Sequence, residues 1–257
     1  MKEETFILRI FRGEAGSQYW EEFEGVLRPF VNVITALMDI QKRPVTKEGD
    51  TVGPVVWEAG CLEEVCGSCS MLVNGKPRQA CTALIEPIIK QTRNNVITLA
   101  PLSKFPLVRD LIVDRTSMFE NLKKAVAWVE VDESRAPAAH DKISQEKQEV
   151  MHILATCMTC GCCQEACPQI NARSQFVGPQ VVGQVRLFNI HPTARFQKSE
   201  RLRMMMQEEG ISGCSNAQNC VKACPKEIPL TDAIAAVSRD ATLQAIKDLF
   251  SLPERNE

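Results

Sequence analysis

The sequence predicts an α+β protein, with a sheet in its N-terminal part and helices in its C-terminal part. Two short segments near the N-terminus are rich in β-branched and aromatic residues, 5–12 and 19–24. Helices are suggested in three later segments, 180–188, 198–208 (with Ser199 near its start and Gly210 just after it) and 230–249. The 12 cysteines form two groups, at 61–81 and at 157–224, and none lies in the 75 residues between them. We therefore expect two domains, each with its own cysteine site.

Composition narrows the possible functions. A chain of 257 residues is long enough for two domains that each bury an apolar core. The formal net charge of −2, from 30 basic and 32 acidic residues, argues against nucleic acid as a partner. No run of about 18 apolar residues predicts a membrane span, and the first residues do not predict a secretory signal. We expect a reducing compartment, in which thiolates remain available to bind metal.

The N-terminal part begins with a predicted hairpin. Thr5–Arg12 and Tyr19–Glu24 are the two strands, and Gly13–Ser17 connects them. A helix is expected after Asn32, a suitable N-cap, because the apolar residues that follow have helical spacing: Val33, Ile34, Leu37, Met38 and Ile40. Two strands followed by a helix are how a ubiquitin-like β-grasp fold begins.

The first cysteine group has the C-x4-C-x2-C…C spacing of plant-type 2Fe-2S ferredoxins, formed by Cys61, Cys66, Cys69 and Cys81. Small residues beside the thiols, such as Gly67, allow backbone N–H groups to point at sulfur. The Asn-Gly pair at 74–75 predicts a hairpin turn that returns Cys81 to the other three. A zinc loop is the alternative, and it is weaker because both the spacing and the expected fold match the iron–sulfur case.

The two domains are predicted to be joined by a helix and a polar linker. We expect a β-grasp domain over 1–110, a connecting helix and linker over 111–148, and a helical domain over 149–257. A helix that starts near Gln145 should deliver Cys157. In the second domain, the basic run Arg195, Lys198, Arg201 and Arg203 precedes three methionines and predicts a solvated helix face with some methionines packed inside.

The second cysteine group contains C-x2-C-x2-C-x3-C-P, the spacing with which bacterial-type ferredoxins hold one cluster and lend the fourth cysteine to another. That rule assigns a 4Fe-4S cluster to Cys157, Cys160, Cys163 and Cys224. It assigns the other cluster to Cys167, Cys214 and Cys220. Position 217, where a fourth thiolate would be expected, is Ala217, and three ligands suit a 3Fe-4S cluster. The all-α second domain should therefore be bacterial-ferredoxin-like.

Other uses of these cysteines are weaker. Disulfides require an oxidising compartment. Structural zinc also selects C-x2-C pairs, but it does not need a proline after the last cysteine. Cys162 has no spacing partner and is expected to be a small buried apolar residue and not a ligand.

The sequence contains no nucleophile–base pair, phosphate loop or dinucleotide fingerprint. We therefore expect no catalytic residues and no substrate-converting site in this chain alone. Three clusters on one chain would make a series of one-electron carriers, useful between a two-electron donor such as a reduced flavin and a distant acceptor. Such a chain needs a partner at each end.

Four stretches of the sequence closely resemble the iron–sulfur subunit of succinate dehydrogenase and fumarate reductase. They are Cys61–Cys69, Asn74–Cys81, Cys157–Gly161 and Cys214–Pro225, and the similarity runs over nearly the whole chain. The resemblance implies a flavoprotein partner whose FAD oxidises succinate to fumarate. It also implies a haem-containing membrane anchor that binds quinone, with this chain peripheral between the two on the cytoplasmic face of the membrane.

The chain departs from the mitochondrial-like branch of this family at the quinone site. A tryptophan and a histidine of that branch are replaced by Asn171-Ala172 and Ser215. The resemblance is therefore to the Gram-positive type, whose di-haem anchor uses menaquinone, and Pro168 and Ser215 are pocket candidates by position. Two alternatives stay open: a fumarate reductase subunit that works in the reverse direction, and a free multi-cluster ferredoxin-like carrier.

Overall fold

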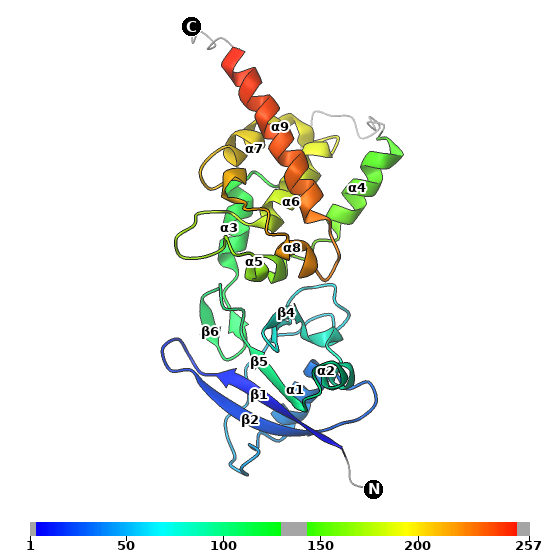
Figure 1. Ribbon diagram of the computed structural model, residues 1–257, viewed down its shortest axis with the longest axis vertical. Helices are drawn as coiled ribbons and strands as arrows, with labels where there is room; N and C mark the ends of the chain where they lie inside the picture. Colours follow the sequence, from blue (N-terminus) through cyan, green and yellow to red (C-terminus); the bar gives the residue numbers. More distant parts are fainter. Residues whose placement is uncertain (1–3, 130–142, 251–257) are drawn as a thin grey trace. The chain divides into compact units, whose positions relative to one another are not determined.

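The computed structural model describes residues 4–129 and 143–250, which form two compact units (Figure 1). The first unit contains the chain up to Arg115 together with Met158–Ala166. The second contains Thr116–Cys157 and the chain from Cys167 onward. Much of the linker predicted within 111–148 lies outside the described residues. The assignment of Met158–Ala166 to the first unit has no signal in the sequence.

The first unit is built on a five-stranded sheet with the order β2-β1-β5-β3-β4. Its strands are β1 (Thr5–Arg12), β2 (Tyr19–Val26), β3 (Ser70–Val73), β4 (Lys76–Gln79) and β5 (Val96–Ala100). The predicted hairpins β1–β2 and β3–β4 are both confirmed as antiparallel pairs. The parallel pairing of β1 with β5 places the first and the last strand of this sheet, in sequence order, side by side. A separate two-stranded sheet contains β6 (Leu107–Arg109) and β7 (Ile112–Val113).

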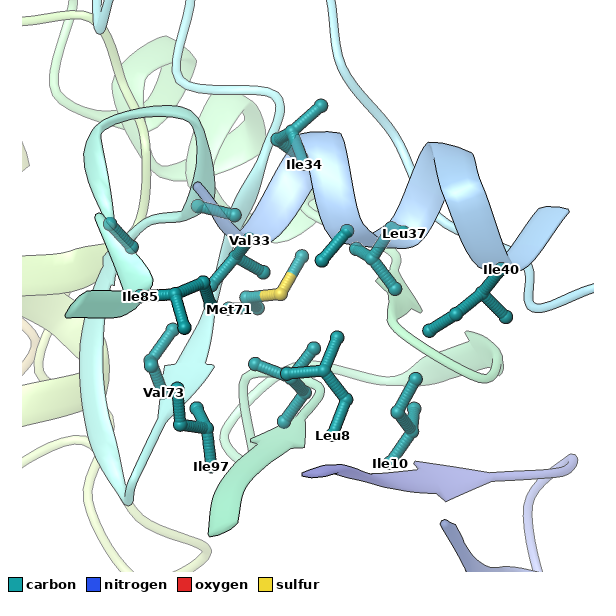
Figure 2. Close-up of a cluster of buried hydrophobic side chains, with 14 of the residues drawn as sticks. Leu8, Ile10, Val33, Ile34, Leu37, Ile40, Met71, Val73, Ile85 and Ile97 are labelled. Atoms are coloured by element: carbon teal, nitrogen blue, oxygen red, sulfur yellow. The ribbon is translucent and has the colours of Figure 1, made fainter. Parts of the chain in front are cut away.

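The helix predicted after Asn32 is confirmed as α1 (Val33–Lys42), which packs on the strands of this sheet (Figure 2). Its N-cap is Asn32, whose side-chain oxygen accepts a hydrogen bond from the Thr35 amide at 2.8 Å. Figure 2 shows Val33, Leu37 and Ile40 of this helix directed toward residues of the strands such as Leu8 and Ile97. Burying each such side chain stabilises the fold by about 1.5–3 kcal/mol. The other helical segments of this unit are α2 (Ile85–Thr92), α5 (Cys162–Ala166) and the 3₁₀ turn η1 (Ala80–Thr82).

Buried Asp110 fixes the chain that leads into the first cysteine loop. Its carboxylate accepts hydrogen bonds from the amide of Gly13 at 2.7 Å and the amide of Val56 at 2.8 Å. It also forms an ion pair with the guanidinium of Arg12 at 3.5 Å, and both side chains are buried. Because a buried carboxylate is stable only when it is paired and hydrogen-bonded, these contacts hold the three segments together.

The second unit is helical, as predicted. Its helices are α3 (Thr116–Lys124), α4 (Gln145–Ala155), α6 (Pro179–Ile190), α7 (Lys198–Met205), α8 (Asn219–Lys222) and α9 (Leu230–Phe250), with 3₁₀ turns η2 (Ala194–Gln197) and η3 (Ile211–Gly213). Val181, Val185 and Val237 are fully buried in its core, where α6 meets α9. Among the described residues, no helix combines the length and apolar character needed to cross a bilayer.

One expectation about this unit is wrong. The basic run predicts Arg201 on a solvated helix face, but its residue exposure is 0%. Its guanidinium makes hydrogen bonds to the carbonyl oxygens of Val126, Trp128 and Ala194 at 2.7–2.9 Å. Val126 and Trp128 lie just after α3, so the acceptors come from a segment far away in the sequence, which helical periodicity does not detect. The burial of Met205 agrees with the prediction, and the side chain of Arg195 lies outside the described part.

Candidate iron–sulfur centres

The first cysteine group lies in a loop of the first unit that ends at β3, and the β3–β4 hairpin returns the chain to Cys81 in η1. Cys69 and Cys81, at the two ends of the hairpin, are buried. Cys61 is half-buried and Cys66 is exposed, because both belong to the loop that precedes β3. The group therefore has an inner pair on the core and an outer pair toward the surface.

The loop between Cys61 and Cys66 wraps its backbone around one sulfur. The Sγ atom of Cys61 accepts hydrogen bonds from the amides of Glu63 at 3.3 Å, Val65 at 3.2 Å and Cys66 at 3.3 Å. This curvature requires left-handed backbone at two non-glycine residues, Leu62 (φ 63°) and Glu64 (φ 56°). Several amides directed at one atom stabilise negative charge on it, which suits a thiolate ligand.

Cys66 of the outer pair and Cys69 of the inner pair have opposite acid–base character. The pKa of Cys66 is lowered to about 6, first by the Ser68 hydroxyl, whose oxygen lies 3.2 Å from Sγ, and then by the Cys61 amide. The pKa of Cys69 is raised to about 11, mainly by burial. Because metal binding requires thiolates, binding at this group must release the proton that Cys69 otherwise keeps.

The amide donors directed at the sulfurs of Cys61 and Cys66 fit the ligands of a two-iron cluster, which when bound would supply a reversible one-electron couple. We expect Cys66→Ala to abolish the two-iron signal in low-temperature electron paramagnetic resonance (EPR) and to leave the signals of the other clusters. Cys162→Ala is the matched control, because it removes a buried sulfur that is not a predicted ligand and should preserve all signals. Loss of every cluster in Cys66→Ala would contradict independent sites.

The segment Met158–Ala166 carries Cys160 and Cys163, both buried, and belongs to the first unit. Glu165 anchors it, since its carboxylate accepts hydrogen bonds from the Ser103 hydroxyl at 2.6 Å and the Lys104 amide at 3.0 Å. Gly161 has φ 89°, and a Cβ there would lie only 3.1 Å from the Phe105 ring. The segment is thus packed tightly on the residues around 102–105.

The expected burial of Cys162 is confirmed, with 0% exposure. Its sulfur accepts a hydrogen bond from the side-chain amide of Gln79 at 3.6 Å. The contact between Cys160 and Cys162 shifts both thiols. It lowers the pKa of Cys160 to about 7 and raises the pKa of Cys162. Cys160 is therefore the readier ligand of the two.

The second unit brings Cys167, Cys214 and Cys220 together. All three line one small cavity, and Ala217 lines it as well. Burial, followed by the neighbouring Cys167 and Cys214, raises the pKa of Cys220. Pro168 and Ser215, the residues predicted by position for a quinone pocket, also line this cavity. The three cysteines and Ala217, the position at which a fourth thiolate would be expected, thus line the same cavity.

The predicted four-iron set is divided between the units. Cys160 and Cys163 belong to the first unit, whereas Cys157 and Cys224 belong to the second. Across residues 4–129 and 143–250, no group of three or more histidine, cysteine, aspartate or glutamate side chains is arranged to hold a single metal ion. The four-iron assignment therefore remains a prediction from spacing.

Two domain families match the chain in the expected order. A family described as "2Fe-2S iron-sulfur cluster binding domain" matches residues 7–120. A family described as "4Fe-4S dicluster domain" matches residues 153–228. Together with the cysteine loops described above, these matches define the class: a multi-cluster iron–sulfur protein of electron transfer.

Individual relatives narrow that class. The succinate dehydrogenase iron–sulfur subunit of Bacillus subtilis is 50% identical over 232 residues, which cover 90% of this chain and 90% of the relative. The fumarate reductase iron–sulfur subunit of Wolinella succinogenes is 33% identical over 181 residues, or 70% of this chain and 74% of that one. The chain belongs to the family of iron–sulfur subunits of succinate dehydrogenase and fumarate reductase, which confirms the resemblance inferred from its motifs.

A solved structure supports the fold. A chain of the Mycobacterium smegmatis Sdh1 complex in the apo form superposes with a TM-score of 0.80 at 22% identity, covering 95% of this chain and 98% of that one. The predicted α+β class, with a two-iron ferredoxin domain followed by a ferredoxin-like helical part, is confirmed.

Sequence reasoning missed several polar residues around the cysteine loops. Arg115 and Gln79 contact the segment Met158–Ala166 from within the first unit, and Glu165 of that segment bonds to Ser103 and Lys104. Gln79 lies in the stretch Asn74–Cys81, but its contact with Cys162 has no signal in the sequence, because the partners of all three residues include groups distant in sequence. Only the folded chain brings these groups together.

Proposed function

We propose that this chain is the iron–sulfur subunit of a succinate:quinone oxidoreductase, a complex in which succinate is oxidised to fumarate. In this role the chain carries electrons, one at a time, from the FAD of a flavoprotein partner to a membrane quinone, and it converts no substrate itself. The observation that carries the proposal is the arrangement of three separate cysteine sets along one chain that is 50% identical to a succinate dehydrogenase subunit.

The proposed ligands follow the cysteine spacing. The two-iron cluster is bound by Cys61, Cys66, Cys69 and Cys81; the four-iron cluster by Cys157, Cys160, Cys163 and Cys224; and the three-iron cluster by Cys167, Cys214 and Cys220. The shared cavity of the last three, with Ala217 beside them, supports a cluster with three protein ligands. The proposed domain bounds are 1–110, 111–148 and 149–257.

The proposed partners are an FAD-containing flavoprotein and a haem-containing membrane anchor that binds menaquinone. The chain acts as a peripheral subunit on the cytoplasmic face of the membrane, and nucleic acid is not a partner. Pro168 and Ser215 are proposed to contribute to the quinone pocket, because both line the cavity with the three cysteines. The identity of 33% to a fumarate reductase subunit supports a second candidate, the same complex working in the direction of fumarate reduction.

Low-temperature EPR on native membranes, before and after adding succinate as the only reductant, tests the proposal. We expect a three-iron signal in the oxidised sample to disappear while a two-iron signal grows. Dithionite is the control, because it reduces the clusters without a flavoprotein. Signals that respond to dithionite and stay oxidised with succinate would reject succinate as the donor. A protein that stays in the supernatant when membranes are sedimented would instead favour the free carrier.

A further inference from the structure

Arg115 lies just after β7 and reaches both cysteine loops of the first unit. Its guanidinium donates hydrogen bonds to the carbonyl oxygens of Gly67 at 2.7 Å, Ser68 at 3.4 Å and Cys160 at 3.4 Å. It also forms an ion pair with the Glu58 carboxylate at 3.3 Å. Only 18% of its side chain is exposed, so solvent screens this charge less than it would on the surface.

The carbonyl groups that Arg115 contacts lie in two different loops, and each loop carries predicted ligands of a different cluster. Gly67 and Ser68 separate Cys66 from Cys69 in the two-iron loop, whereas Cys160 belongs to the four-iron set. The two loops also touch each other directly. Gly67 has φ 75°, and a Cβ there would lie 2.9 Å from the Cβ of Cys160 and 2.9 Å from the carbonyl oxygen of Met158. The two backbones are therefore as close as a residue without a side chain allows.

A second, separate connection joins the same two loops. The fully buried side chain of Gln79 accepts a hydrogen bond from the Cys69 thiol at 3.5 Å and donates one to the Cys162 sulfur at 3.6 Å. Its amide nitrogen also donates to the Ser70 hydroxyl at 2.8 Å. Of the two side chains that join the loops in these contacts, Gln79 is neutral and Arg115 is charged.

We propose that Arg115 is a positioning residue that clamps the two-iron loop to the four-iron loop and holds its guanidinium, which is paired with the Glu58 carboxylate, beside both loops, so that removing it leaves that carboxylate unpaired. The inference rests on the proposed function, because it requires Cys160 to be a cluster ligand. The planar guanidinium can bond carbonyls of both loops at once, which the single ammonium of a lysine cannot reproduce. A fixed positive charge stabilises the reduced form of each site, since reduction adds negative charge, and so it raises both reduction potentials.

The test is a redox titration of the purified, cluster-loaded complex with chemical mediators, followed by EPR of the two-iron and four-iron signals. Arg115→Gln removes the charge. We expect both midpoint potentials to fall, with a change of about tenfold in each reduction equilibrium, which is about 59 mV for a one-electron couple. Arg115→Lys keeps the positive charge but loses the planar guanidinium that bonds both loops. Its midpoint potentials should therefore lie between those of Arg115→Gln and those of wild type. Arg109→Gln on β6, whose side chain is exposed, is the matched control and should leave both potentials unchanged.

Wild-type potentials in Arg115→Gln would overturn the proposal, and so would equal shifts in Arg115→Gln and Arg109→Gln. A lower melting temperature with unchanged potentials would show a purely structural role and would also overturn it. If Arg115→Gln fails to assemble, Arg115→Lys tests the proposal instead. Wild-type midpoint potentials in Arg115→Lys would exclude a positioning role for the guanidinium. Because mediators replace succinate, a failure of succinate to reduce the clusters would reject the proposed function and leave this test intact.

Discussion

Arg201→Leu is expected to lower the melting temperature of the protein by about 10 °C. The guanidinium of Arg201 is fully buried on α7, and its hydrogen bonds to carbonyl oxygens include 2.7 Å contacts to Val126 and Ala194. Further acceptors are the Trp128 carbonyl and the side-chain oxygens of Asn189 and Gln197. Removing the donor leaves buried oxygens without partners, at a cost of about 4 kcal/mol, and each kcal/mol lowers the melting temperature by about 2–4 °C in a chain of this size.

Thermal unfolding of the wild-type and variant proteins, monitored by circular dichroism, measures this effect. Arg203→Leu is the matched control on the same helix. Arg203 is exposed and forms a bidentate ion pair with Asp248 at 2.9 Å, an interaction that solvent weakens. We expect the control to unfold within a few degrees of wild type. Equal melting temperatures for Arg201→Leu and wild type would contradict the structural role of this arginine.

Ala217→Cys is expected to replace the three-iron EPR signal with that of a four-iron cluster. Ala217 lines the same cavity as Cys167, Cys214 and Cys220, so a thiolate at this position would face the site as a fourth ligand. The added thiolate charge stabilises the oxidised state and lowers the reduction potential. We therefore also expect slower reduction of quinone by succinate in membranes that contain the variant.

Ala217→Ser is the matched control, because a serine is close to cysteine in size but supplies no thiolate, which is the ligand that iron–sulfur clusters select. It should keep the three-iron signal. EPR of the oxidised proteins, with a redox titration of each, measures both expectations. An unchanged three-iron signal in Ala217→Cys would refute the assignment of Cys167, Cys214 and Cys220 to one cluster.

The spacing of the cysteines in the sequence is enough to predict iron–sulfur ligands. Ligand spacing such as C-x4-C-x2-C is local, because a cluster must be reached by thiols on one short loop, and so Cys61, Cys66 and Cys69 are recognisable without a fold. The hairpin that returns Cys81 is equally local, since the Asn-Gly turn at 74–75 determines its register. Helix α1 follows from an N-cap and a 3.6-residue period within ten residues.

The contacts that join the cysteine loops depended on the tertiary structure. Met158–Ala166 packs with residues that precede Arg115, and neither periodicity nor spacing indicates this, because its anchors are a carboxylate, a glycine contact and backbone carbonyls. The basic run that contains Arg201 predicts the wrong environment for this side chain for a related reason. Arg201 is buried by acceptors at Val126 and Trp128, which lie 75 and 73 residues earlier in the chain.

Local patterns therefore predict which atoms bind metal, since ligation depends on the chemistry and spacing of a few thiols. They do not show which charges and amides surround those atoms. That environment is made by long-range contacts, such as those of Arg115 with Gly67 and Cys160, which form only when the chain has folded. Because the charges and hydrogen bonds around a cluster set its reduction potential, the family of this protein follows from its sequence, whereas the tuning of its electron transfer is decided by its tertiary structure.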